Sequence, residues 1–127
     1  MKLKNFSLSY GMPLFKSLSD EARVRILNLL LENREMCISD LEQILDFTQT
    51  KTSRHLTYLK NAGIVNARKE DQWIFYSIKE EVQDYMNQVL NYVKRDPILI
   101  KDVQNYDTMY SNRELAAYKI RSRRYVS

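Results

Sequence analysis

The chain has 127 residues, 44% of them hydrophobic, and a formal net charge of +4. This length fits one ordinary domain, and the apolar content suffices for a packed core, which argues against a disordered chain. No apolar run reaches the length of a membrane span or a signal peptide, and the single cysteine, Cys37, rules out an internal disulfide. We therefore expect a cytoplasmic protein without a cofactor.

The charges are unevenly distributed along the chain. Residues 48–69 carry five basic and no acidic side chains, whereas residues 32–46 carry five acidic side chains and one basic. A second basic block, with five basic residues and one acidic, covers residues 111–127. A basic block is often only a solvated face, but two of them around an acidic middle are typical of a surface that binds a polyanion.

Helical periodicity dominates the first half of the chain. Apolar residues recur at helical spacing over residues 10–18 and again over residues 22–31, where Ser19 or Asp20 is a candidate N-cap. Residues 36–38 are predicted to form a short extended piece. Ser39 and Glu42 then make a capping-box pattern that predicts the start of a third helix.

A fourth helix and a hairpin follow. Thr48 is predicted to cap a helix that runs to about residue 61, and Gly63 stands where a helix needs a left-handed terminating residue. Residues 64–69 and 73–78 are rich in β-branched and aromatic side chains and flank a short polar turn, so they predict a two-stranded β-hairpin. Asp71 in that turn tolerates left-handed geometry.

The C-terminal part is again helical. An amphipathic helix from about residue 82 is interrupted at Pro97, a further stripe follows, and Ser111 with Glu114 forms a capping box before a short basic helix. We divide the chain at this proline into residues 1–96 and residues 97–127, a helical extension with a basic tail.

The order of helix, turn, helix and hairpin predicts a mainly α winged helix-turn-helix. The fourth helix opens with hydroxyls, an amide and two cations, which suit DNA because Gln pairs with adenine edges, Arg with guanine, and Ser or Thr with bases or phosphate. Its positive N-terminal end also favours phosphate. The candidate DNA-binding residues are Gln49, Thr50, Lys51, Thr52, Ser53, Arg54, His55, Lys60, Arg68 and Lys69, the last two assigned to phosphate contact from the hairpin.

Three stretches resemble the ArsR/SmtB family of bacterial regulators. Residues 14–27 (LFKSLSDEARVRIL) are similar to its opening signature, residues 48–56 (TQTKTSRHL) with 59–65 (LKNAGIV) to its recognition helix and exit, and residues 73–76 (WIFY) to its second wing strand. The resemblance covers roughly residues 10–93. It implies a homodimer that binds a palindromic operator on double-stranded DNA, usually a repressor released by an inducer. Residues 1–96 are then expected to be the DNA-binding and dimerisation domain, and the basic tail is predicted either to contact DNA or, with more weight, to pack in the dimer. Our candidates for core or dimer packing are Phe15, Val82, Met86, Val89 and Leu90.

The sequence departs from the family at its metal sites. The Cys-x-Cys of the arsenic and cadmium sensors corresponds here to Cys37 and Ser39, and a hydroxyl is a poor ligand for a soft metal. The long dimer helix contains no histidine, because the only one in the chain is His55. We therefore expect no metal effector. A redox role for Cys37 alone is possible chemically, but a small half-buried residue is the favoured interpretation.

Other functions compete less well. An enzyme is disfavoured because the chain has no glycine-rich phosphate loop and no histidine outside the recognition helix to serve a nucleophile. The main alternative is a winged helix that binds another protein and not DNA. Exposure of Gln49 and Arg54 would favour DNA, and burial of that face would favour the alternative. A small-molecule effector would require an apolar pocket between the terminal helices.

Overall fold

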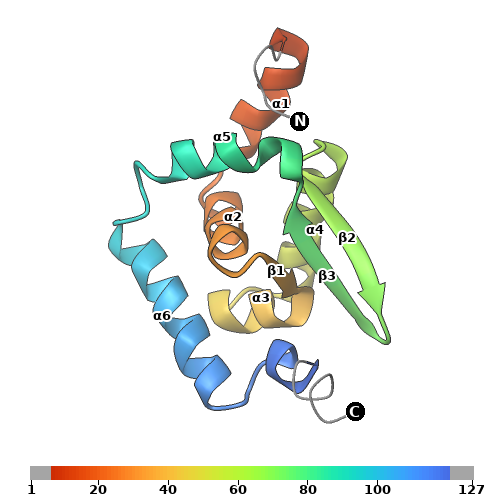
Figure 1. The fold of residues 1–127 in the computed structure, drawn as a ribbon, viewed down its shortest axis with the longest axis vertical. Coiled ribbons are helices and arrows are strands. Elements are labelled where there is room, and N and C mark those ends of the chain that lie inside the picture. Colours follow the sequence, from red (N-terminus) through yellow and green to blue (C-terminus); the bar gives the residue numbers. More distant parts are fainter. Residues whose placement is uncertain (1–6, 121–127) are drawn as a thin grey trace.

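The computed structural model describes residues 7–120, which form a winged helix-turn-helix, as the sequence predicts (Figure 1). The elements in chain order are α1 (Leu8–Ser17), α2 (Glu21–Asn33), β1 (Glu35–Cys37), α3 (Ile38–Leu45), α4 (Gln49–Asn61), β2 (Val65–Glu70), β3 (Trp73–Ile78), α5 (Glu80–Leu90) and α6 (Pro97–Ser111). The basic tail beyond Ile120 lies outside the described residues.

The wing belongs to a three-stranded antiparallel sheet in the order β1-β3-β2. The hairpin turn is as predicted: Glu70 pairs with Trp73, and Asp71 takes a left-handed φ of 54° between them. The short extended piece predicted at residues 36–38 is a third strand, because residues 35–37 pair with residues 75–77 of β3. This third strand buries Met36 and Cys37 and closes the inner edge of the hairpin against the helices.

The core is centred on α2, which lies in the middle of the molecule (Figure 1). Ile26, Leu27, Leu29 and Leu30 are at most 1% exposed, because α4, α5, α6 and strands β1 and β3 pack around this helix. Among the predicted packing residues, α5 buries Val82, Met86 and Leu90, whereas Phe15 of α1 is 48% exposed. The core also contains Tyr106 of α6, so the C-terminal extension packs into the same core as the winged helix.

Local capping signals were only partly right. The Asp20 carboxylate accepts from the backbone N–H of Ala22 at 2.8 Å and caps α2. Ser39, in contrast, caps nothing, because α3 already begins at Ile38 with Cys37 as its N-cap residue. The Ser39 hydroxyl instead lies 3.3 Å from the Cys37 thiol.

The C-terminal helices begin and end at other residues than predicted. The helix before Pro97 ends at Leu90, and Pro97 occupies the first turn of α6, where proline is well tolerated. The Asp96 carboxylate caps this helix by accepting from the N–H of Ile98 at 2.9 Å. Ser111 is not a cap, since α6 continues through it. Among residues 7–120, no helix is both long enough and apolar enough to cross a membrane.

The segment after α6 is held by Asp40 of α3. One carboxylate oxygen accepts from the N–H of Ala116 at 2.7 Å and the other from Ala117 at 3.0 Å, so a buried side chain caps the helical turn at residues 116–120. Burial raises the pKa of Asp40, while the two N–H donors act in the opposite direction. Below this cap, Ala116 and Ile120 pack on Cys37 and Phe75.

We expect Asp40→Ala to release this segment. Two buried N–H groups would lose their acceptor, which should lower the free energy of unfolding by about 1–3 kcal/mol. Amides 116–120 should exchange faster with solvent, and Cys37 should react faster with a thiol reagent. Hydrogen exchange and thiol labelling measure both effects, with Asp107→Ala on the exposed side of α6 as the control. Unchanged exchange at Ala116 and Ala117 would contradict the role of Asp40.

Candidate nucleic-acid interface

The start of α4 is built as the sequence predicts. Asp46 ends α3 in a left-handed conformation with φ of 56°, and the chain turns through Phe47 into Thr48. The Thr48 hydroxyl accepts from the N–H of Lys51 at 3.1 Å and leaves the other N–H groups of the first turn available. No acidic residue lies in that turn, so the helix presents its positive end without a competing carboxylate.

One side of α4 is buried, and this corrects two of the predicted DNA contacts. Thr52 is 0% exposed, and its hydroxyl donates to the Thr48 carbonyl at 2.9 Å. His55 is 5% exposed and packs on the same side as Leu56 and Leu59, which are both fully buried. Thr52 and His55 therefore face the core and position the helix, because their side chains are not available to a ligand outside it.

The opposite face of α4 is polar and open. Gln49, Thr50, Ser53 and Arg54 are all exposed, and together with Thr57 they line a shallow hollow. Thr57 was not among the predicted residues, although its spacing of three and four residues from Arg54 and Ser53 places it on this face. The exposure of Gln49 and Arg54 is the arrangement that favours a nucleic-acid partner over a buried, structural role.

The lysines of α4 differ in their surroundings. The Lys51 ammonium lies 4.0 Å from the centroid of the Phe47 ring, so this side chain is half-buried at the turn between α3 and α4. Lys60 is exposed in the last turn of the helix, where a cation also favours the helix dipole. Both lie at the edges of the polar face.

The wing offers less free positive charge than its sequence suggests. Arg68 donates to both carboxylate oxygens of Glu35 at 2.7 Å and to Glu70 at 2.9 Å. These hydrogen bonds raise the pKa of Arg68 and offset its charge with two carboxylates. Arg68 therefore stays exposed but is paired within the sheet, whereas Lys69 of the same strand is exposed as well.

Arg23 of α2 contacts both the end of α1 and α4, and the sequence did not identify it as a residue that positions α4. Its guanidinium donates to the carbonyls of Ser17 and Lys16 at 3.0 Å each, at the end of α1. The same group lies 4.1 Å from the centroid of the Tyr58 ring and 3.5 Å from Nδ1 of His55. Arg23 falls inside the 14–27 signature, which is the only sequence signal that singled it out.

Cys37, the candidate redox residue, is 1% exposed. Its thiol is covered by the C-terminal segment and by Phe75, and its nearest polar neighbour is the Ser39 hydroxyl. Oxidation of a thiol requires access to solvent, which this packing does not provide. Among the residues that the structure describes, no group of three or more His, Cys, Asp and Glu side chains is placed to hold a metal ion.

His55 should titrate below the usual range. Burial lowers its pKa from the ordinary 6.5, and the Arg54, Arg23 and Lys51 charges add to this, against an opposing effect of Asp20. The unfolded chain then binds more protons than the folded one between the two pKa values, so stability is lost as the pH falls through the folded-state pKa. Because His55 is the only histidine, its ring signals in a proton NMR titration measure the pKa without ambiguity. A midpoint at or above 6.5 would refute its burial in this site.

Comparison with known proteins agrees with this geometry. Residues 20–67 match the arsR family of bacterial regulatory proteins. The arsenical resistance operon repressor of Escherichia coli is 36% identical over 86 residues, which cover 66% of this chain and 74% of that protein. Against four other curated relatives, which are arsenic and cadmium resistance regulators, the match spans 59% to 66% of their length.

Solved structures share the fold. HlyU of Vibrio cholerae, whose name describes a transcriptional activator, superposes with a TM-score of 0.63 and 32% identity, covering 68% of this chain and 95% of that one. Mb0332 of Mycobacterium bovis, described as a homodimeric winged helix-turn-helix DNA-binding domain, gives 0.63 and 27% identity over 68% and 81%. The chain therefore belongs to the ArsR family, a family of transcriptional regulators and not of enzymes, and it has the winged helix-turn-helix DNA-binding fold.

Proposed function

We propose that this protein is a homodimeric transcriptional repressor that binds a palindromic DNA operator through α4. The observation that carries the proposal is the open face formed by Gln49, Thr50, Ser53, Arg54 and Thr57, which contains hydrogen-bonding groups and a cation but no acid. The repressor role rests on the Escherichia coli relative, which is named a repressor.

The chemistry of this face suits the major groove. A helix of 13 residues is about 20 Å long and narrow enough to enter that groove. In this position Arg54 would donate two hydrogen bonds to a guanine and Gln49 would pair with an adenine, while the hydroxyls would reach bases or phosphates. Lys51, Lys60 and Lys69 would supply attraction to phosphate that does not depend on sequence.

Arg54→Ala should weaken binding to the operator by roughly 5- to 150-fold, the range expected for a lost guanine contact. The measurement is fluorescence anisotropy with duplex fragments of the DNA upstream of the protein's own gene, titrated over salt. Lys101→Ala is the matched control, because it removes one exposed cation from α6 on another side of the core. This control should change the affinity much less than Arg54→Ala.

Two results would contradict the proposal. If every fragment binds equally weakly and Arg54→Ala changes nothing, the open face of α4 serves a protein partner. If Lys101→Ala and Arg54→Ala weaken binding equally, the attraction is a general effect of charge and α4 does not read sequence.

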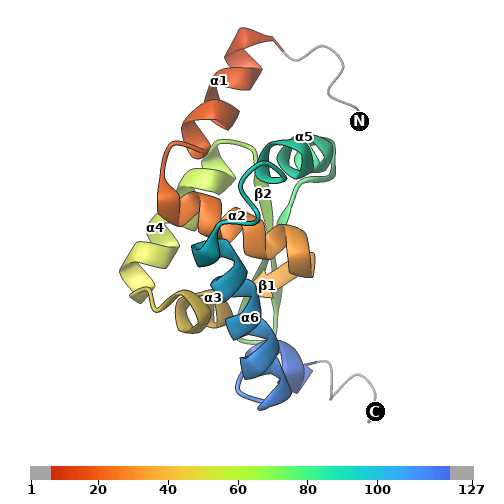
Figure 2. The same cartoon turned by 90° about the vertical axis from the view of Figure 1, so that its left-hand side faces the viewer.

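The dimer is proposed to form through α1. This helix projects from the body of the molecule (Figure 2), and Leu8, Met12 and Phe15 expose 75%, 41% and 48% of their surface. Their spacing of four and three residues places them on one face of the helix, which a second copy would cover. The description of the Mycobacterium bovis protein as homodimeric supports a dimer, and the exposed apolar face is the reason for proposing α1 as its interface.

Replacing Leu8 and Met12 together by glutamate should weaken the dimer by at least about 100-fold, because two apolar side chains lose their burial and two charges enter the contact. Sedimentation velocity over a concentration series measures this. Ile100→Glu on α6 is the control, since Ile100 is comparably exposed at 42%. Dissociation by Ile100→Glu alone would place the interface on α6 and refute the α1 dimer.

The inducer is proposed to be an organic molecule and not a metal ion. The position that would hold a second thiol is Ser39, whose hydroxyl already lies against Cys37. A lone buried thiol beside a hydroxyl is a weak donor set for a soft metal ion.

A further inference from the structure

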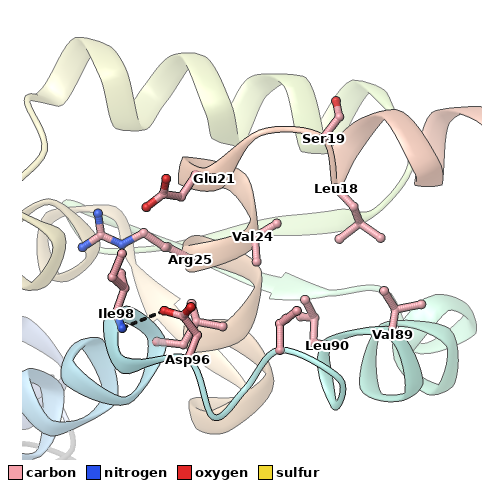
Figure 3. Close-up of a pocket in the computed structure, with 11 residues that line it drawn as sticks. Leu18, Ser19, Glu21, Val24, Arg25, Val89, Leu90, Asp96 and Ile98 are labelled. Atoms are coloured by element: carbon pink, nitrogen blue, oxygen red, sulfur yellow. Dashed lines mark hydrogen bonds between the residues drawn. The ribbon is translucent and has the colours of Figure 1, made fainter.

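A cavity of about 440 Å³ lies between α2, the C-terminal end of α5 and the start of α6. Figure 3 shows Val24 of α2 facing Val89 and Leu90 across it, with Leu18 at the end nearest α1. Val93, Ile98 and Leu99 complete the apolar lining. This volume falls within the range of roughly 300–1,000 Å³ that is typical of small-molecule sites, and such sites combine apolar walls with a few polar groups.

The polar groups of the cavity carry an excess of negative charge. Glu21 and Asp96 line it, and so does Arg25 (Figure 3). The Arg25 guanidinium is already committed, because it donates to both oxygens of the buried Asp102 at 2.9 Å each. Glu21 interacts with the same guanidinium through its charge, and the Asp96 carboxylate accepts from the N–H of Ile98. Lys94, which follows Val93 in the chain, lines a different cavity.

We propose that this cavity binds a small hydrophobic cation, such as an aromatic or alkyl amine, with its apolar body between α2 and α5 and its charged group between Glu21 and Asp96. An anion would meet two carboxylates and no free guanidinium. A neutral apolar molecule would gain nothing from the charges of Glu21 and Asp96, so the charge of the site favours the cation.

The same site is connected to α4 through Arg25. The Arg25 guanidinium lies 5.2 Å from the centroid of the Phe47 ring, at the turn between α3 and α4, and the Lys51 ammonium lies 4.0 Å from the same centroid. A cation beside Glu21 competes with Arg25 for negative charge and so shifts its position relative to Phe47. This makes the cavity the inducer site of the regulator, a conclusion that rests on the proposed function.

The test uses two probes with the same apolar body, 4-phenylbutylamine and 4-phenylbutanoate. Methyl NMR spectra of the full chain, without DNA, report binding through Val24, Val89, Val93 and Leu90. The amine should bind about tenfold more tightly than the carboxylate. It should also shift the backbone amides of Phe47 and Lys51, which lie outside the cavity.

The variants separate the charge of the cavity from the charge of the whole protein. Glu21→Gln with Asp96→Asn should remove the preference for the amine, and asparagine at position 96 keeps the helix cap. Asp84→Asn with Asp107→Asn changes the net charge equally, at exposed sites outside the cavity, and should keep the preference. Val93→Trp should fill the cavity and abolish binding of both probes.

Three outcomes would overturn the proposal. The first is that the carboxylate binds as tightly as the amine or more tightly, and the second is that binding survives Val93→Trp. The third is that the cavity methyl signals move when the protein is diluted and not when the probe is added, which would mean that a second copy occupies the site. Because no DNA is present, these results do not depend on operator binding. Amine binding without shifts at Phe47 and Lys51 would refute the connection to α4 alone.

Discussion

The exposed face of α4 depends on the burial of its opposite face against α2. Leu56 and Leu59 are fully buried, and each contributes about 1.5–3 kcal/mol by leaving water. Turning the helix by one residue, about 100°, would expose these leucines and bury Arg54. Apolar burial therefore fixes which residues point outward, and the hydrogen bonds around it, each worth about 1 kcal/mol net, define the angle more finely. Arg23 supplies several of these contacts and holds α4 against the end of α1.

Two arginines on α2 connect it to opposite parts of the molecule. Arg23 contacts α1 and α4, while Arg25 pairs with Asp102 of α6 and lies over Phe47. Residues two positions apart on a helix point about 200° apart, so α2 can hold the DNA-binding helix on one side and the C-terminal extension on the other. The extension thus contacts the helix-turn-helix at two places. Asp102 of α6 binds Arg25 of α2, and the segment after α6 is capped by Asp40 of α3. Movement of α6 consequently acts on helices that position α4.

Features that depend on neighbouring residues were predictable, and those that depend on distant ones were not. Thr48 as a cap, Gly63 with φ of 77° and the turn at Asp71 follow from local backbone requirements. The pairing of β1 with β3 and of Arg68 with Glu35 joins residues more than thirty positions apart, which no local pattern encodes. The prediction that Ser39 caps α3 was wrong for a different reason. A capping-box pattern indicates that a helix begins nearby, but not at which residue it begins.

The burial of Thr52 and His55 could have been predicted from the sequence. Both residues are three or four positions from Leu56 or Leu59, so the spacing of the leucines already places them on the buried side. Residue type alone does not show on which side of a recognition helix a polar side chain lies. The same spacing argument, applied outward from Arg54, would have included Thr57. The arrangement around the helix is therefore a stronger guide to this interface than residue type.

The charge available for DNA is smaller than the sequence suggests, and this makes dimerisation important to the proposed function. Of the five cations in residues 48–69, Arg68 is paired with two carboxylates and Lys51 is half-buried against Phe47. Arg54, Lys60 and Lys69 are exposed. Each phosphate neutralised by a cation adds about 0.9 to the slope of log affinity against log salt, so these three would give one copy only a weak electrostatic hold on DNA. A second copy on the other half of a palindrome doubles these contacts and the base contacts together, and disruption of the α1 contact would therefore cost operator affinity even if α4 remained intact.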